Sequence, residues 1–204
     1  MGVGLVVVDI QSDFCTGGSL AVSGSEGVVE RVNELVATNR EMFDVVVASK
    51  DWHPVEHTSF ATNHPGTKVF DTIQLENGKD QIMWPVHCVQ LSSGAELHPQ
   101  LKVRHDPELI EVHKGCAKDK EAYSAFDDTN LAEILRSHDV SEVYVVGLAT
   151  DYCVLHTAMD AVRNGFKTTL IRDCCAAVAE TTELEALRRM QDAGVTIIST
   201  FAKI

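Results

Sequence analysis

Continuous apolar runs alternate with helical patterns along most of this chain. Residues 5–9 (LVVVD) form an apolar run that ends in an acid, which is typical of a parallel strand buried on both faces. Residues 26–39 follow with Val28, Val32 and Leu35 at helical spacing and predict a helix. Further strands are predicted over 43–49, 108–113, 142–147, 167–173 and 195–199, and further helices over 129–138 and about 152–164.

A last helix is predicted between a capping box, formed by Thr182 and Glu185, and the glycine at position 194. The six predicted strands therefore alternate with helices. This order predicts a three-layer α/β fold, in which a six-stranded, mostly parallel sheet has helices on both faces.

Residues 50–107 break the alternation. They hold few periodic signals, are rich in histidine and proline, and contain both tryptophans of the chain. A long irregular stretch inside a compact domain is usually functional. We therefore expect a single domain over residues 1–204, with an active-site and metal-binding loop region at about 50–107.

The charge balance excludes some classes of partner. The net charge is −13 and the pI is near 5.0, whereas nucleic acids and anionic membrane surfaces attract Lys and Arg. No apolar run approaches the roughly 18 residues that cross a membrane, and the N-terminus lacks the basic region of a signal peptide. We therefore expect no nucleic-acid partner and no membrane partner, and the sequence leaves a homo-oligomer open.

The six cysteines form no CxxC pair, and their scatter does not resemble a disulfide framework. We expect free thiols in a reducing compartment, and hence a cytoplasmic protein. The last three residues, Ala202-Lys203-Ile204, faintly resemble the peroxisomal Ser-Lys-Leu signal, which leaves a peroxisome-like compartment as the alternative.

Four reactive side chains stand at the ends of predicted strands. Asp9 ends the first strand, Asp51 lies just past the second, Lys114 follows the third and Cys153 follows the fourth. Because ligands of open parallel sheets bind beyond the carboxyl ends of the strands, we expect these four side chains to meet at one edge of the sheet.

Cys153 is expected in the first turn of its helix, with Thr150 or Asp151 as the cap. Unpaired amide groups and the helix dipole at such a position lower the pKa of a thiol and favour the nucleophilic thiolate. The alternative is a small buried hydrophobe, which describes most free cysteines.

Asp9 and Lys114 would complete a cysteine amidase. A carboxylate can take the thiol proton and return it to the leaving amine, and an ammonium nearby keeps that carboxylate ionised. The alternatives are an acid that caps a turn for Asp9 and a solvated surface residue for Lys114.

A second pattern contains Asp51, His53 and His57 in "KDWHPVEH" and His87 in "WPVHC". A carboxylate with imidazoles is a ligand set that zinc, iron or manganese would accept. The alternative is a turn anchored by Pro54 with exposed histidines.

Five stretches together resemble the nicotinamidase/pyrazinamidase group of the isochorismatase-like cysteine hydrolases. They are "VVVDIQSDFCTGGSLAV", "ASKDWHPVEHTSF", "WPVHCVQ", "HKG" with "YSAF" following, and "GLATDYCV". The resemblance runs from about residue 5 to residue 200, and the "DWHP…WPxHC" pattern is what narrows it to nicotinamidases.

The resemblance implies a role for each matching residue. Asp9, Lys114 and Cys153 would form the catalytic triad, and the amides of Ala149 and Cys153 would form an oxyanion hole beside a cis peptide bond between Leu148 and Ala149. The implied metal ligands are Asp51, His53 and His87, with His57 as a further candidate. The implied walls of the substrate pocket are Phe14, Leu20, Trp84, Tyr123 and Tyr152.

The resemblance also implies the reaction: hydrolysis of nicotinamide, and also of pyrazinamide, to the acid and ammonia through a thioester. The cofactor would be one divalent metal ion, zinc first and iron or manganese as alternatives, with no organic cofactor. Two alternatives stay open: another amidase or carbamoyl hydrolase of the superfamily, and a non-enzymatic metal-binding redox sensor with Cys153 as its thiol.

Overall fold

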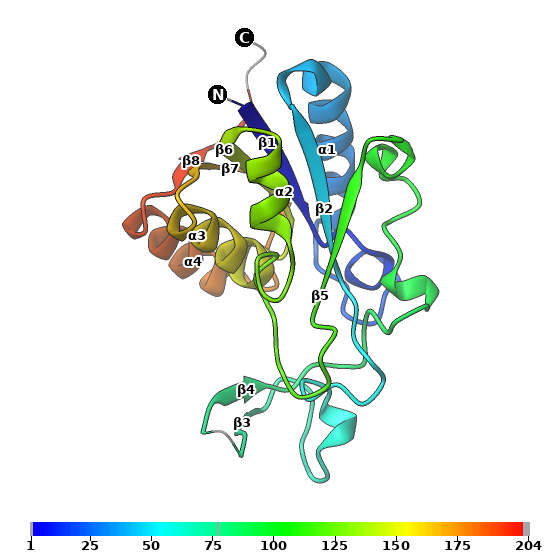
Figure 1. The fold of residues 1–204 in the computed structure, drawn as a ribbon. Coiled ribbons are helices and arrows are strands. Elements are labelled where there is room, and N and C mark those ends of the chain that lie inside the picture. Colours follow the sequence, from blue (N-terminus) through cyan, green and yellow to red (C-terminus); the bar gives the residue numbers. More distant parts are fainter. Residues whose placement is uncertain (1, 77, 202–204) are drawn as a thin grey trace.

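A six-stranded parallel sheet forms the centre of the computed structural model, which describes residues 2–76 and 78–201 (Figure 1). The strands stand in the order β5-β2-β1-β6-β7-β8, and every neighbouring pair is parallel. Their bounds are β1 Gly2–Val8, β2 Val45–Asp51, β5 Ile110–Lys114, β6 Val140–Leu148, β7 Lys167–Ala176 and β8 Thr196–Ile198. The predicted α/β fold with a six-stranded sheet is confirmed.

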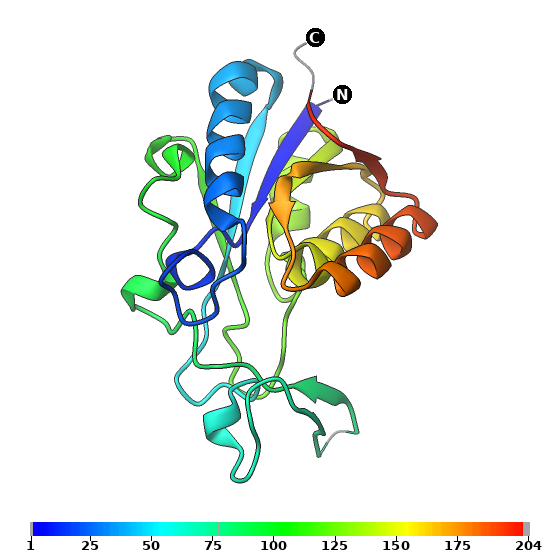
Figure 2. The same ribbon diagram turned by 180° about the vertical axis from the view of Figure 1, so that it is seen from behind.

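Helices cover both faces of this sheet. They are α1 Ser25–Asn39, α2 Leu131–Ser137, α3 Leu155–Arg163 and α4 Glu180–Asp192. Side chains of a strand alternate between faces, so Leu5 and Val7 of β1 pack with α1, whereas Val6 and Val8 pack with α2, α3 and α4. Figure 2 shows α1 lying over the strands on its own side.

The strand order reverses between β1 and β6. From β1 the chain builds outward through β2 to β5, and it then returns to β6 on the other side of β1 and builds outward through β7 to β8. Such a reversal leaves a crevice at the carboxyl ends of the two central strands, where α/β proteins bind their ligands. Asp9 directly follows β1, and Cys153 lies in a π-helical turn (Thr150–Val154) soon after β6.

Residues 52–109, here called the connecting segment, join β2 to β5. The segment contains three short 3₁₀ turns (Ala61–Asn63, Ser93–Ala95 and Lys102–His105) and a hairpin of β3 Thr72–Gln74 and β4 Asp80–Ile82. The hairpin lies beyond the carboxyl ends of the strands, at the end of the molecule far from both termini (Figures 1 and 2).

The start of α4 differs from the prediction. The helix begins at Glu180 with Ala179 at the N-cap position, and Ala179 has no side chain that could cap it. Thr182 is therefore inside the first turn and is not the cap. The physical reason is that the carboxylate of Asp151, from a distant segment, accepts hydrogen bonds at this helix start, which a local pattern cannot reveal.

All six cysteines are free, as the sequence predicts. Among the described residues, no helix is long and apolar enough to cross a membrane. The C-terminal tripeptide Ala202-Lys203-Ile204, on which the peroxisomal alternative rests, lies outside the described residues.

Candidate active site

A buried ammonium stands at the centre of the site. Lys114 is the last residue of β5, directly paired with Asp51, the last residue of β2. Its Nζ lies 2.9 Å from Asp9 Oδ2 and donates to Asp51 Oδ1, to the Ala122 carbonyl at 3.1 Å and to Cys153 Sγ at 3.4 Å. The structure thus brings the four strand-end residues together, as their positions in the sequence predict.

Asp9 and Cys153 come from neighbouring central strands. Oxygens of Asp9 and Asp51 and the Cys153 sulfur all lie within 4.8 Å of one another, and the Ser49 hydroxyl donates to Asp9 Oδ1 at 2.6 Å. Gly147 lets β6 approach β1 here, because its φ is +125° and a Cβ would collide with the Val8 carbonyl. The Leu148–Ala149 peptide bond is cis.

Burial changes the protonation of this group. It raises the pKa of the Cys153 thiol well above its usual value, with the charges of Asp9 and Asp51 adding to the rise and Lys114 opposing it. The lowered thiol pKa expected from the helix start alone is therefore outweighed by desolvation. Burial likewise raises the pKa of the Asp9 carboxyl, against the pull of Lys114. The Asp9 carboxyl is the acid that directly follows β1 and lies within 4.8 Å of the Cys153 sulfur.

A second group lies next to the first. Single donor atoms of Asp51, His53 and His87 lie within 4.8 Å of one another, and all three residues are buried. The Nδ1 atoms of His53 and His87 face the carbonyls of Gly115 at 2.9 Å and Pro85 at 2.8 Å. A carbonyl only accepts, so each Nδ1 carries the hydrogen and each Nε2 keeps its lone pair.

Those Nε2 atoms converge on one carboxylate oxygen. The Asp51 Oδ2 atom lies 3.5 Å from Nε2 of His53 and 3.8 Å from Nε2 of His87. A glycine is required behind His53, because Gly115 has a φ of +65° and a Cβ there would collide with the imidazole. Two imidazole nitrogens and a carboxylate oxygen are a typical ligand set for a divalent transition metal. The residues present therefore fit such an ion.

The charge state of His87 also fits, whereas burial lowers the pKa of His53 but Asp51 and other neighbouring groups together raise it above its usual value. Burial lowers the pKa of His87 to about 4, with His53 adding to the shift, and a metal ligand must be neutral imidazole. Burial alone would raise the pKa of the Asp51 carboxyl. The charges of Lys114 and His53 outweigh burial and hold that pKa well below its usual range.

His57 lies beside this group with different partners. Its ring centroid is 4.1 Å from that of His53, but its Nδ1 faces Ser59 Oγ at 2.8 Å and its Nε2 faces the Lys120 carbonyl at 3.1 Å. Both nitrogens thus have protein partners, so His57 is not directed at Asp51 in this arrangement. Its role as a metal ligand stays a prediction.

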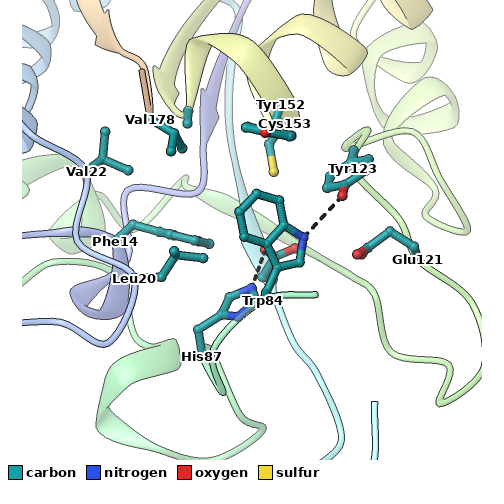
Figure 3. Close-up of a pocket in the computed structure, with 12 residues that line it drawn as sticks. Phe14, Leu20, Val22, Trp84, His87, Glu121, Tyr123, Tyr152, Cys153 and Val178 are labelled. Atoms are coloured by element: carbon teal, nitrogen blue, oxygen red, sulfur yellow. Dashed lines mark hydrogen bonds and ion pairs between the residues drawn. The ribbon is translucent and has the colours of Figure 1, made fainter. Parts of the chain in front are cut away.

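A hollow opens onto both groups (Figure 3). The Trp84 indole donates to the Tyr123 hydroxyl at 3.2 Å and stands edge-on to Tyr152, with centroids 4.9 Å apart. The five predicted wall residues, Phe14, Leu20, Trp84, Tyr123 and Tyr152, all line this hollow, together with Asp51, His87, Ala149 and Cys153.

Three further lining residues, Val22, Glu121 and Val178, were not among the predicted site residues. Val22 ends the stretch "VVVDIQSDFCTGGSLAV", whereas Val178 is an apolar residue outside the five stretches, and the folded chain places both at the hollow. Glu121 could have been noticed as an acid between the "HKG" and "YSAF" stretches. In the structure its carboxylate lies within 4.8 Å of donor atoms of His53 and His57.

Comparison with known proteins agrees with this site. The isochorismatase domain model matches residues 3–201. The nicotinamidase of Acinetobacter baylyi is 42% identical over 203 residues, covering 96% of this chain and 92% of that protein. The chain therefore belongs to the isochorismatase family.

Two solved structures share the fold over nearly their whole length. The nicotinamidase/pyrazinamidase of Acinetobacter baumannii has a TM-score of 0.88 at 41% identity, covering 97% of this chain and 95% of that one. The pyrazinamidase of Pyrococcus horikoshii in complex with zinc has a TM-score of 0.82 at 37% identity, covering 98% of this chain and all (100%) of that one.

Proposed function

We propose that this protein is a nicotinamidase, a cysteine amidohydrolase that converts nicotinamide to nicotinate and ammonia. The observation that carries the proposal is the pocket itself, where Cys153 and its Lys114–Asp9 ion pair face an Asp51–His53–His87 group between aromatic walls. The names of the relatives support the same substrate.

In this proposal the pocket walls orient a flat ring. Phe14 and Leu20 lie on one side of the view and Tyr123 on the other, with the Trp84 indole between them (Figure 3). Asp51, His53 and His87 would hold a divalent metal ion, which supplies a Lewis acid for the ring nitrogen. With the ring held between these walls, the carboxamide carbon is presented to Cys153, and such orientation removes several kcal/mol from a barrier, on the order of 7–11 in favourable cases.

The Asp9 carboxylate moves the proton. It takes the proton from the Cys153 thiol as sulfur attacks the amide carbon, and returns it to the leaving nitrogen so that ammonia departs. A thioester to Cys153 remains. Asp9 then takes a proton from a water molecule as it attacks the thioester, the C–S bond breaks, and Asp9 returns the proton to the Cys153 sulfur as nicotinate is released. Lys114 holds Asp9 in place throughout.

Negative charge develops on the amide oxygen in both steps. We propose the backbone amides of Ala149 and Cys153 as its hydrogen-bond donors, since both residues line the pocket. Cys153 lies in the π-helical turn Thr150–Val154, here called the nucleophile turn, and Ala149 directly precedes that turn.

Zinc is our first choice for the metal ion. Two histidines and an aspartate suit it, and the Pyrococcus relative was solved with zinc. Iron and manganese accept the same donors. We also propose a cytoplasmic location, in keeping with six free cysteines.

The test is ammonia release from nicotinamide, pyrazinamide and benzamide, with elemental analysis of the purified protein. Nicotinamide and pyrazinamide carry a ring nitrogen and should turn over, whereas benzamide lacks it and should react at least about 100-fold more slowly. Removal of the metal with a chelator should abolish nicotinamide turnover, and zinc should restore it. Equal rates for benzamide and nicotinamide, or full activity without metal, would instead favour another amidase or carbamoyl hydrolase of the family.

A further inference from the structure

Asp151 is a buried acid that the reaction outlined above does not use. It lies two residues before Cys153 in the nucleophile turn, and only 7% of it is exposed. Its carboxylate does not cap the turn to which it belongs, because the N-cap residue Ala149 precedes it and that turn has no side-chain cap. The expectation that Thr150 or Asp151 caps the helix of Cys153 is therefore wrong.

The carboxylate turns instead to the start of α4. Oδ1 accepts the Val178 amide hydrogen at 3.0 Å, and Oδ2 accepts from the Ala179 amide at 3.3 Å and from the Thr182 hydroxyl. Val178 and Ala179 directly precede α4, and a carboxylate near the start of a helix also interacts favourably with the helix dipole. Asp151 thus anchors the chain that enters α4.

One of these three donors belongs to the substrate pocket. The Val178 side chain lines the same hollow as Cys153, and Figure 3 shows the two on the same edge of it. Val178 is 37% exposed and precedes the helix, so it lies in a connecting stretch and not in the rigid part of α4. The hydrogen bond from the Val178 amide to the Asp151 carboxylate connects this part of the pocket wall to the nucleophile turn.

We propose that Asp151 is a positioning residue that fixes the Val178 wall relative to the Cys153 sulfur, and thereby limits the size of the ring that the pocket accepts. This inference rests on the proposed nicotinamidase function. Without the carboxylate, the stretch around Val178 is free to move outward, and the pocket loses its discrimination against substituted rings.

A purely structural role for Asp151 would have another signature. Loss of the three hydrogen bonds to Asp151 lowers stability, and so does comparable damage elsewhere in α4. Met190 supplies the matched control, because it lies in the same helix, is fully buried at 0% exposure and does not line the pocket. Met190→Ala should lower the melting temperature and leave substrate discrimination unchanged.

The experiment compares wild type, Asp151→Ala, Asp151→Asn and Met190→Ala. For each, kcat/KM is measured for nicotinamide and for its 4-, 5- and 6-methyl derivatives, alongside the melting temperature. The discrimination ratio is kcat/KM for nicotinamide divided by kcat/KM for a methyl derivative. We expect the largest of the three wild-type ratios to fall by about tenfold in Asp151→Ala, which is the scale of one methyl group in a tight pocket. Asp151→Asn, which keeps one acceptor oxygen, should fall between Asp151→Ala and wild type.

Val178→Ala provides a variant that widens the same wall and leaves the carboxylate in place. It should lower the same ratio without lowering the melting temperature as far as Asp151→Ala does. If Asp151→Ala does not fold, Asp151→Asn decides by the same criterion.

Ratios in the Asp151 variants that stay equal to those of wild type and Met190→Ala would overturn the inference while leaving the nicotinamidase function intact. A wild-type protein that releases no ammonia from nicotinamide would instead overturn the proposed function.

Discussion

The carboxyl edge of the sheet and the connecting segment each supply half of the site, but they do so differently. Asp9, Lys114 and Cys153 stand at or just after the ends of β1, β5 and β6, so the sheet alone sets their spacing. His53 and His87 lie in the connecting segment, outside the six-stranded sheet, where individual hydrogen bonds hold the backbone. One of these bonds runs from the His53 amide to the Cys88 carbonyl at 3.0 Å.

Gln11 joins the two halves. It is fully buried, and its side chain amide donates to the carbonyls of Asp51 and Ala95 at 2.8 Å each, while its oxygen accepts the Asp51 amide hydrogen at 2.8 Å. The comparison teaches that the proposed nucleophile, Cys153, is positioned by packing and the proposed metal ligands by a polar network. Asp51, which ends β2 and touches Lys114 as well as facing the histidines, belongs to both.

The largest effect is expected at the proton carrier of the sheet edge. Asp9→Asn keeps the shape of the side chain but cannot take the thiol proton, so kcat for nicotinamide should fall by about 10²–10⁴-fold. Asp44→Asn is the matched control, because Asp44 is exposed just before β2, at the other end of the strands. A loss of less than about threefold in Asp9→Asn would remove Asp9 from the reaction.

The next largest effect is expected on the free energy of unfolding, when the Lys114 ammonium that contacts both Asp9 and Asp51 is removed. Lys114→Met leaves Asp9 and Asp51 buried without their shared partner, which should lower the free energy of unfolding by about 3–5 kcal/mol in urea titrations of metal-free protein. Lys167→Met, whose partner Glu142 lies at 3.0 Å on the surface, should change it by no more than about 0.5 kcal/mol. Equal effects of the two substitutions would contradict the buried ion pair.

A smaller effect is expected in the pocket wall. Tyr123→Phe leaves the buried Trp84 indole without its acceptor at 3.2 Å, which costs about 1 kcal/mol and should raise KM for nicotinamide about fivefold. Tyr144→Phe, on β6 against Phe43 and Phe201, should leave KM unchanged. If both variants keep the wild-type KM, Tyr123 does not orient the substrate.

The smallest effect is expected in the pH dependence of the melting temperature, through His156, which stacks on Tyr123 of the pocket wall. Burial lowers the pKa of His156, with Arg189 adding to the shift, and its ring stacks on Tyr123 at 5.3 Å. The unfolded chain then binds the proton more readily, so His156 costs stability as the pH falls below its ordinary pKa of about 6.5 and costs nothing above it. His156→Gln should flatten the fall of the melting temperature between about pH 6.5 and pH 5. A slope identical to wild type would contradict this.

The sheet and the sheet-edge residues were predictable because their causes are local. An apolar run such as LVVVD predicts a buried strand, and parallel order then predicts that Asp9, Asp51, Lys114 and Cys153 meet. The strand ends were within a few residues of those observed, and the resemblance correctly implied the cis bond before Ala149.

The remainder depends on contacts between distant segments. Asp151 anchors the start of α4 from a distance, since it lies 31 residues from Thr182. The raised pKa of Cys153 depends on burial, which a helix-start pattern does not report. The β3–β4 hairpin consists of two three-residue strands, too short for a periodic signal.

The most direct test of the two-part site compares Cys153→Ala with His87→Ala in three measurements: ammonia release from nicotinamide, bound metal by elemental analysis, and iodoacetamide labelling at position 153. Both variants should lose activity, Cys153→Ala by at least about 10⁴-fold. Cys153→Ala should keep its metal, whereas His87→Ala should lose metal and keep a thiol that iodoacetamide labels. Full activity in Cys153→Ala, or unchanged metal content in His87→Ala, would contradict the account.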